Sequence, residues 1–200
     1  MRTRTSLAIV GAVLTASALT ACTENGTPVA SQTGSPNTSA TTTPDNAETA
    51  PRVKDPISAA DSIGKPCTLL TPTQATGLGL KAEGSQDSNG SDPYCSWHDK
   101  DNRALYTIGF LSENTNGLND HYRAESKGDW KYFEPTTVAT YPAVLADGVD
   151  SREKGYCTVV VGVRDELTFR VASRGGPGRA ACDKVKDIAG EVINTLKAGA

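Results

Sequence analysis

The chain has 200 residues, of which 37% are hydrophobic, 22% charged and 6% aromatic, and its formal net charge is −3. This length suits one ordinary domain with a tail, and the acidic balance excludes the basic footprint of a nucleic-acid-binding protein. Two histidines and one methionine leave little material for a histidine-rich metal site or a methionine-lined groove.

The first residues have the pattern of an export signal. Arg2 and Arg4 form a short positive segment, and residues 7–19 are uncharged and mostly apolar or small. A helix of that length spans roughly 20 Å, which is too short for a hydrocarbon core of roughly 30 Å. We therefore expect a cleaved secretory signal rather than a membrane span.

The signal ends in Leu19-Thr20-Ala21-Cys22, which resembles the lipobox of bacterial lipoproteins. In that family the cysteine receives a diacylglyceryl group and becomes the new N-terminus. The resemblance implies a signal peptide over residues 1–21, a lipid on Cys22, and anchoring at the extracytoplasmic face of the cell membrane. The alternative is an ordinary cleavage site beside a chance cysteine. The mature chain would have 18 basic and 23 acidic residues, so the lipid rather than charge would hold it to the membrane.

Residues 22–56 are expected to form a disordered tether rich in Thr, Ser, Pro and Ala. Between residues 23 and 50, Val29 is the only hydrophobic residue other than alanine. Such a stretch cannot bury enough apolar surface to offset a chain entropy of roughly 1–2 kcal/mol per residue. Residues 57–200 are then predicted to form a single domain.

The first element of this domain is a short helix that begins with Thr71 as N-cap and Pro72 at its first position, and ends near Leu78. The later expected elements, in chain order, are strands over 94–99 and 103–111, a helix over 117–127, an extended stretch over 130–145, a hairpin of strands over 156–163 and 166–172, and a helix after Pro177-Gly178. Pro135 and Pro142 favour edge strands within the extended stretch.

The last helix has the clearest pattern. Its apolar residues have the spacing of one buried stripe: Ala181, Cys182, Val185, Ile188, Ala189, Val192, Ile193 and Leu196. In the hairpin, Cys157, Val159 and Val161 share one strand face. A helix with one apolar stripe on a sheet with one apolar face predicts an α+β fold, with an antiparallel sheet of about five strands covered by the C-terminal helix.

Four cysteines remain after Cys22, and an even number in an exported domain implies two disulfides. Cys157 lies on the inward strand face and Cys182 on the inward helix stripe, so these two are expected to pair. Cys67 is then left for Cys95. A four-cysteine zinc site is disfavoured because no two cysteines have the close spacing of zinc ligands, and a redox-active pair lacks the Cys-x-x-Cys motif.

Several short motifs carry a resemblance to a known family. They are Pro66-Cys67-Thr68-Leu69-Leu70-Thr71, Cys95-Ser96-Trp97, Tyr156-Cys157 and Ala181-Cys182. Together with the Thr-rich tether, they resemble the actinobacterial lipoproteins grouped as domain of unknown function 3558. The resemblance covers about Ile57–Leu196 and the lipobox, and it implies location and architecture without a reaction or functional residues.

No motif indicates an enzyme, a cofactor or a metal ion. The chain lacks a Gly-x-Ser-x-Gly elbow, a His-Glu-x-x-His helix and a Walker-type loop. His98 and His121 could each act as a base or a metal ligand. His98 alternates onto the strand face opposite Cys95 and Trp97, so we expect it to be exposed to solvent.

Two segments are candidates for ligand or partner contact. In the run from Arg174 to Arg179, a glycine-rich loop precedes a helix, so its N–H groups and both arginines could hold an anion. The alternative is loop punctuation by Gly and Pro. The aromatic segment 130–133 is the other candidate, with Trp130 and Tyr132 on one face and Phe133 on the other. One set could face a glycan or a partner protein, or all could fill the core.

These features favour a non-catalytic binding, sensory or interaction module at the cell envelope. Its expected partners are the membrane, through the lipid on Cys22, and an envelope protein, glycan or lipid. The alternative is an envelope lipid or glycan carrier, or a small hydrolase. A large apolar cavity would favour the carrier, and a cleft with a histidine beside a carboxylate would favour the hydrolase.

Overall fold

The structure is a computed structural model that describes residues 49–88 and 92–199. The expected signal peptide, Cys22 and all but the last residues of the expected tether lie outside the described residues. Within the described ranges, no helix is long and apolar enough to cross a membrane.

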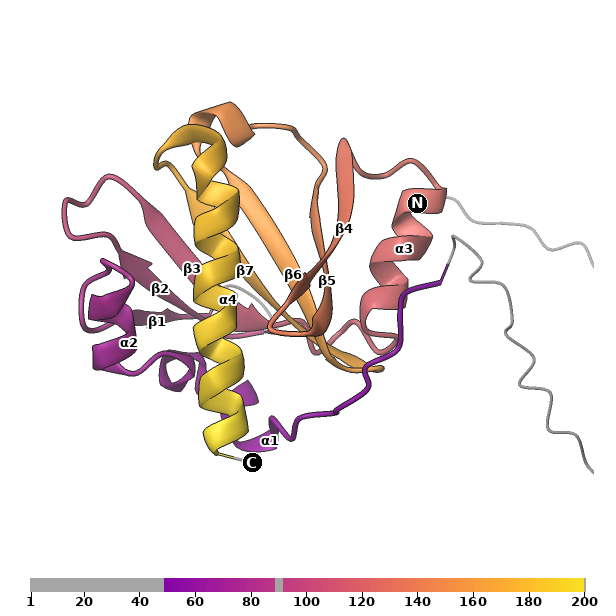
Figure 1. Cartoon of the computed structure of the whole chain (residues 1–200), viewed down its shortest axis with the longest axis horizontal. Helices are drawn as coiled ribbons and strands as arrows, with labels where there is room; N and C mark the ends of the chain where they lie inside the picture. The colour runs from indigo at the N-terminus through magenta and orange to yellow at the C-terminus, as the bar shows by residue number, and fades with distance from the viewer. Residues whose placement is uncertain (1–48, 89–91, 200) are drawn as a thin grey trace, which may run out of the picture. The chain divides into compact units, whose positions relative to one another are not determined.

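The elements follow one another in this order (Figure 1): α1 (Ala60–Ile63), the 3₁₀ helix η1 (Pro66–Leu69), α2 (Pro72–Gly77), β1 (Ser85–Asp87), β2 (Tyr94–His98), β3 (Leu105–Phe110), α3 (Leu118–Ser126), β4 (Tyr132–Val138), β5 (Tyr141–Asp147), η2 (Arg152–Lys154), β6 (Cys157–Arg164), β7 (Leu167–Arg174), η3 (Gly178–Ala180) and α4 (Ala181–Ala198). The N-terminus of α2 has the expected cap. The Thr71 side chain accepts from the Gln74 N–H, and the Gln74 side chain accepts from the Thr71 N–H.

The expectation of about five strands is wrong: the strands form a seven-stranded antiparallel sheet in the order β1-β2-β3-β7-β6-β5-β4. β1 is a three-residue strand whose residues are all exposed, so it has no hydrophobic alternation to reveal it. The stretch 130–145 is two strands, joined by a tight turn at Ala139-Thr140 where both φ angles are positive. The turn has neither Gly nor Asn, the residues that usually indicate a tight hairpin turn in a sequence. The α+β class itself stands.

The two prolines of this stretch lie in different places. Pro135 is in β4, which is an edge strand of the sheet as expected. Pro142 is in β5, which lies between β4 and β6, so the expectation of an edge strand is wrong there. The ladder between β5 and β6 pairs only Ala143–Leu145. Pro142 therefore lies outside that ladder and needs no N–H donor on that side.

One face of the sheet is covered by α4, which runs across it in Figure 1. The apolar stripe of α4 packs on inward residues of β6 and β7 to form the main core. Val185, Ile188, Val192 and Ile193 are all fully buried. Burial of such a side chain contributes about 1.5–3 kcal/mol, so this helix is a principal source of stability.

The opposite face of the sheet is divided in two. Over β5 and β6, Leu118 and Tyr122 of α3 pack on Val144, Ala146 and Val160 in a second apolar cluster. Over β2, β3 and β7, the same face carries polar side chains that are exposed or half-exposed. Antiparallel sheets commonly leave one face exposed to solvent. This polar area contains the candidate site described below.

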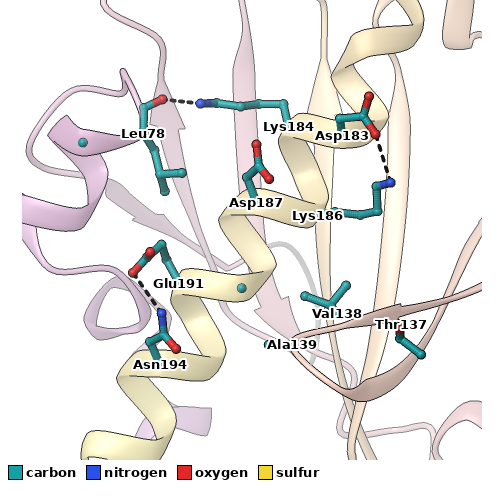
Figure 2. Close-up of a pocket in the computed structure, with 12 residues that line it drawn as sticks. Leu78, Thr137, Val138, Ala139, Asp183, Lys184, Lys186, Asp187, Glu191 and Asn194 are labelled. Atoms are coloured by element: carbon teal, nitrogen blue, oxygen red, sulfur yellow. Dashed lines mark hydrogen bonds and ion pairs between the residues drawn. The ribbon is translucent and has the colours of Figure 1, made fainter.

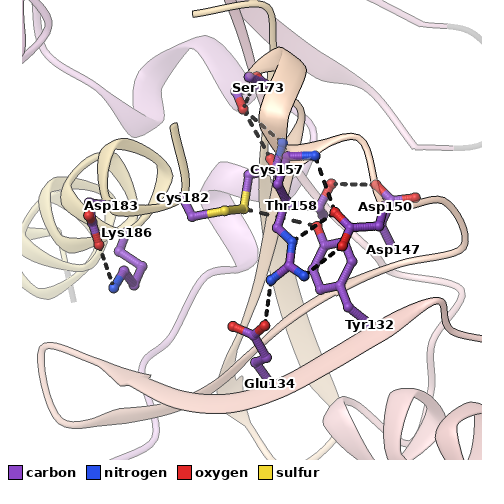
Figure 3. Close-up of a disulfide and its surroundings, with 12 residues drawn as sticks. Tyr132, Glu134, Asp147, Asp150, Cys157, Thr158, Ser173, Cys182, Asp183 and Lys186 are labelled. Carbon is purple, nitrogen blue, oxygen red and sulfur yellow. Dashed lines mark hydrogen bonds and ion pairs between the residues drawn. A yellow bond between two sulfur atoms is a disulfide. The ribbon is translucent and has the colours of Figure 1, made fainter. Parts of the chain in front are cut away.

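Two disulfides join distant segments. Cys67 in η1 bonds Cys95 in β2 with 5.0 Å between Cα atoms, and Cys157 in β6 bonds Cys182 in α4 with 5.2 Å (Figure 3). The Cys157–Cys182 pairing is the one that strand alternation and the helix stripe indicated, and Cys67–Cys95 is the pairing expected by elimination. All four cysteines are in disulfides, so the four-cysteine zinc alternative is wrong.

The chain just before residue 57 lies against the domain. The Asp165 carboxylate accepts from the Val53 N–H and pairs with Arg52, and Ala50 N–H donates to the Asn119 side chain. The Ile57 N–H donates to the Val163 carbonyl at the end of β6. Residues 50–56, expected to belong to the tether, thus make specific contacts with the folded part.

Candidate functional site

The polar area of the sheet forms an open trough of about 640 Å³. Strand register shows how it is built. Ser96, Thr107, Ala172 and Thr158 are neighbours across β2, β3, β7 and β6. Because these side chains are short, this row is the floor of the trough and offers three hydroxyl groups to a ligand.

The walls of the trough come from the rows two residues to either side, which lie on the same face of each strand. On one side, Tyr94 and Arg170 flank Gly109, which has no side chain. On the other side, Leu105 is paired with Arg174. Tyr156, just before β6, is 44% exposed and lines the trough as well. Strand spacing separates Arg170 and Arg174 by roughly 13–14 Å between Cα atoms.

The acidic and basic side chains of the trough differ in their partners. The Asp87 carboxylate accepts from the Tyr94 hydroxyl at 3.2 Å, and the Asp147 carboxylate accepts from the Thr158 hydroxyl at 3.3 Å. Six of the eight arginines in the described ranges form ion pairs with other described residues. The two that form none are Arg170 and Arg174, and both line this trough. The site therefore presents two guanidinium groups available to an anion.

The glycine-rich run does not bring its two arginines together. Arg174 lines the trough, whereas Arg179 pairs with Glu153 of η2. Gly175 has φ +77°, and a Cβ there would lie 2.7 Å from the Arg103 carbonyl oxygen. Close passage of the backbone thus accounts for this glycine. The structure supports loop punctuation rather than an anion-binding loop.

Packing buries most of the aromatic segment. Tyr132 and Phe133 lie on opposite faces as expected, but the expectation that Trp130 shares the face of Tyr132 is wrong. Tyr132 is buried in the core beneath α4, while Trp130 and Phe133 pack with the cluster beneath α3. Trp130 precedes β4, which begins at Tyr132, so strand alternation does not extend to it. Neither Trp130 nor Tyr132 lines the trough.

Tyr132 also forms part of a cation–π arrangement near the Cys157–Cys182 disulfide (Figure 3). The Arg152 guanidinium lies 4.0 Å from the Tyr132 ring centre and forms ion pairs with Asp150 and Glu134. The hydrogen bonds from Arg152 hold the pKa of the Asp150 carboxyl at about 2, well below its ordinary value. The Arg152 side chain is only 11% exposed, so this cluster fixes the loop between β5 and β6 rather than serving a ligand.

The histidines take different positions. His98 is exposed, as expected. His121 is buried, and its ring stacks on Trp130 with 5.6 Å between ring centres. Its Nε2 lies 3.3 Å from the amide nitrogen of Asn114, and its Nδ1 has no partner among the described residues. Burial lowers the pKa of His121.

This lowered pKa predicts a loss of stability in mild acid. Below about pH 6.5 the unfolded chain binds a proton at His121 that the native state resists, so the free energy of unfolding falls as the pH decreases. We expect His121→Phe, which keeps an aromatic ring against Trp130, to flatten this dependence between pH 7 and 5. Urea unfolding at several pH values measures it, with His98→Gln as the control. An unchanged slope in His121→Phe would assign the acid sensitivity to other groups.

A second hollow, of about 700 Å³, lies between α4 and the end of the β4–β5 hairpin (Figure 2). Several of its charged groups are already bound within the domain. Lys186 pairs with Asp183, Lys184 donates to the Leu78 carbonyl, and Glu191 accepts from Gln74. This groove thus differs from the trough, where neither arginine forms an ion pair within the part of the chain that the structure describes. Among the residues that the structure describes, no group of His, Cys, Asp and Glu could hold a metal ion.

Comparison with protein families identifies the chain. The family described as "Protein of unknown function (DUF3558)" matches residues 17–195. The chain belongs to this family. No curated protein and no solved structure matches it. The site of this DUF3558 protein must therefore be argued from its own geometry.

Sequence reasoning found Arg174 but missed most of the trough of this DUF3558 protein. The missed residues include Tyr94, Ser96, Thr107, Tyr156, Thr158 and Arg170. Strand alternation could have shown that these side chains point away from the core. Tyr94 and Ser96 alternate with buried residues along β2, and Arg170 lies between buried Phe169 and Val171 on β7. Only the strand order, which places β7 between β3 and β6, shows that these side chains are contiguous.

Proposed function

We propose that this DUF3558 protein is a lipid-anchored, non-catalytic binding module of the cell envelope that holds its ligand in the trough. The observation that carries the proposal is that Arg170 and Arg174, on either side of a hydroxyl-lined floor, form no ion pair with any described residue. Guanidinium groups left without a carboxylate partner provide strong, directional donors for an external anion.

The envelope location rests on the N-terminal sequence. The apolar run and the Leu19-Thr20-Ala21-Cys22 motif are typical of bacterial lipoproteins, which the resemblance to actinobacterial lipoproteins also favours. Two intramolecular disulfides suit an oxidising compartment outside the cytoplasm. Acyl chains on Cys22 would place the domain on the extracytoplasmic face of the membrane.

Replacement of Cys22 tests the anchor. We expect the full-length wild-type protein to incorporate a fatty-acid analogue and to sediment with membranes, because acyl chains contribute about 0.8 kcal/mol per buried CH₂. Cys22→Ala is expected to do neither. In-gel detection of the label, with fractionation of the same cells, gives the measurement. Equal labelling of both proteins would contradict lipidation at this residue.

The trough gives no support to the alternative of a lipid carrier. Its lining is mainly hydroxyl and charged groups, against which a fatty chain would bury little apolar surface. The hydrolase alternative likewise gains nothing from His121, which is buried against Trp130 and does not line the trough.

Filling the trough tests the binding function. The mature chain with Cys22→Ser is titrated with soluble envelope fragments and followed by amide NMR. We expect shifts centred on Ser96, Thr107 and Ala172, with the fragments recovered unchanged. Thr107→Trp is expected to abolish these shifts, because a large ring would occupy the floor.

Thr137→Trp, at an exposed position on β4, is the matched control and should bind as the wild type does. Shifts that map instead to the groove beside α4 would contradict a ligand site in the trough. Fragments that return chemically cleaved would contradict the non-catalytic function.

A further inference from the structure

We infer that the ligand of the trough is an acidic glycan, a chain of sugars bearing carboxylate or phosphate groups, that lies across the strands. This inference rests on the proposed function and specifies its ligand class. It is drawn from the charge of the trough, the direction in which it runs and the chemistry of its floor.

The two arginines of the trough favour a ligand that carries anionic groups. Arg170 and Arg174 are exposed and form no ion pair with any residue in the described ranges, whereas the two acidic residues of the lining already accept internal hydrogen bonds. Asp87 holds the Tyr94 hydroxyl and Asp147 holds the Thr158 hydroxyl. Each carboxylate orients a neighbouring hydroxyl and keeps its negative charge, because the donor is neutral. The favourable positions for the ligand's anionic groups are therefore those beside the two arginines.

Direction selects a chain rather than a single small ion. The floor crosses four adjacent strands, β2, β3, β7 and β6, and strands lie about 4.8 Å apart, so it is roughly 14 Å long. One arginine stands on each side of this floor. A linear ligand in the trough can therefore direct anionic groups to Arg170 from one side and to Arg174 from the other.

The chemistry of the floor favours sugars over an acidic peptide. An extended peptide gains most of its affinity on a sheet from backbone hydrogen bonds to an edge strand, but the trough lies on the face, where backbone groups are already paired in the ladders. What the face offers instead is three hydroxyls. Those of Ser96 and Thr107 can donate or accept, and that of Thr158, which donates to Asp147, can accept, so they match the hydroxyl groups of sugars. The rings of Tyr94 and Tyr156 add flat apolar surfaces for the C–H faces of sugar rings.

The experiment compares matched probes on the mature chain with Cys22→Ser. The probes are a uronic-acid tetrasaccharide, its neutral methyl ester, a phosphorylated tetrasaccharide and a hexa-aspartate peptide, each titrated by amide NMR at two salt concentrations. The carboxylated and phosphorylated sugars separate the two sources of charge. We expect one or both acidic sugars to shift the trough residues, with binding that weakens at higher salt.

Arginine variants assign the contacts. Arg170→Gln and Arg174→Gln are each expected to weaken binding of the acidic sugar about tenfold, since each removes a charge-assisted hydrogen bond. Arg52→Gln is the matched control, because it removes the same charge from an exposed side chain that pairs with Asp165.

Equal binding of the neutral ester, or tighter binding of the peptide, would overturn the inference. If envelope fragments shift the trough residues while both acidic sugars do not, the glycan is wrong and the binding function stands. If neither the envelope fragments nor the acidic sugars shift the trough residues, both the glycan inference and the proposed binding function are wrong.

Discussion

Replacement of Cys157 and Cys182 by alanine is expected to lower the free energy of unfolding by about 3.5 kcal/mol. The bond closes a loop with a sequence separation of 25 residues, and a cross-link of that span removes about this much entropy from the unfolded chain. It also fastens α4, whose buried stripe forms much of the main core, directly to β6. Guanidinium unfolding followed by circular dichroism measures the change.

The second disulfide provides a matched comparison. Cys67→Ala/Cys95→Ala opens a loop with a separation of 28 residues, so its expected loss is also about 3.5 kcal/mol. Removal of both bonds should then leave the domain unfolded in large part, since domains of this size are stable by only about 5–15 kcal/mol. A loss below about 1 kcal/mol for either pair would contradict stabilisation through the unfolded state.

Gly155→Ala is expected to lower the free energy of unfolding by about 3 kcal/mol. Gly155 has φ +77°, which costs an alanine roughly 1–2 kcal/mol. A Cβ there would also lie 2.6 Å from the Gly175 carbonyl carbon and 2.8 Å from the Gly176 nitrogen. Because these are backbone atoms, the loop after β7 would have to move, which adds to the cost.

Two other glycines separate these causes. Gly128 has φ +75° but open space around its Cβ position, so Gly128→Ala should cost only about 1 kcal/mol. Gly190 lies inside α4 with nothing near its Cβ position, so Gly190→Ala should stabilise by about 0.5–1 kcal/mol. Chemical denaturation of all three variants gives the series. Equal losses at Gly128 and Gly155 would show that the backbone contact with Gly175 is unimportant.

The elements with strong local patterns were the ones that sequence reasoning could predict. α4 and the β6–β7 hairpin have long apolar repeats with the period of a helix and of a strand, and the disulfide between Cys157 and Cys182 followed from these two periods. β1 has no apolar residue and the β4–β5 turn has no glycine. Both depend on neighbouring strands rather than on local preference, so the strand count was too low.

The candidate site was likewise predictable only where its residues stand in a local sequence motif. Arg174 was noticed because it begins a glycine-rich run, yet its expected companion Arg179 pairs with Glu153 instead. Its companion across the trough floor is Arg170, four residues earlier on the same strand. Trp130 and Tyr132 attracted attention as aromatics, but the helices on the two faces of the sheet bury them in different clusters.

The amino-acid sequence alone determined the α+β class, the stripe of α4, the disulfide partners and the family resemblance, because each depends on residue types at short or regular spacing. Only the tertiary structure decided which outward residues form one surface. That surface is assembled from β2, β3, β7 and β6, whose order in the sheet differs from their order in the chain. Side chains far apart in sequence become neighbours there through hydrogen-bonded register, which no local pattern encodes.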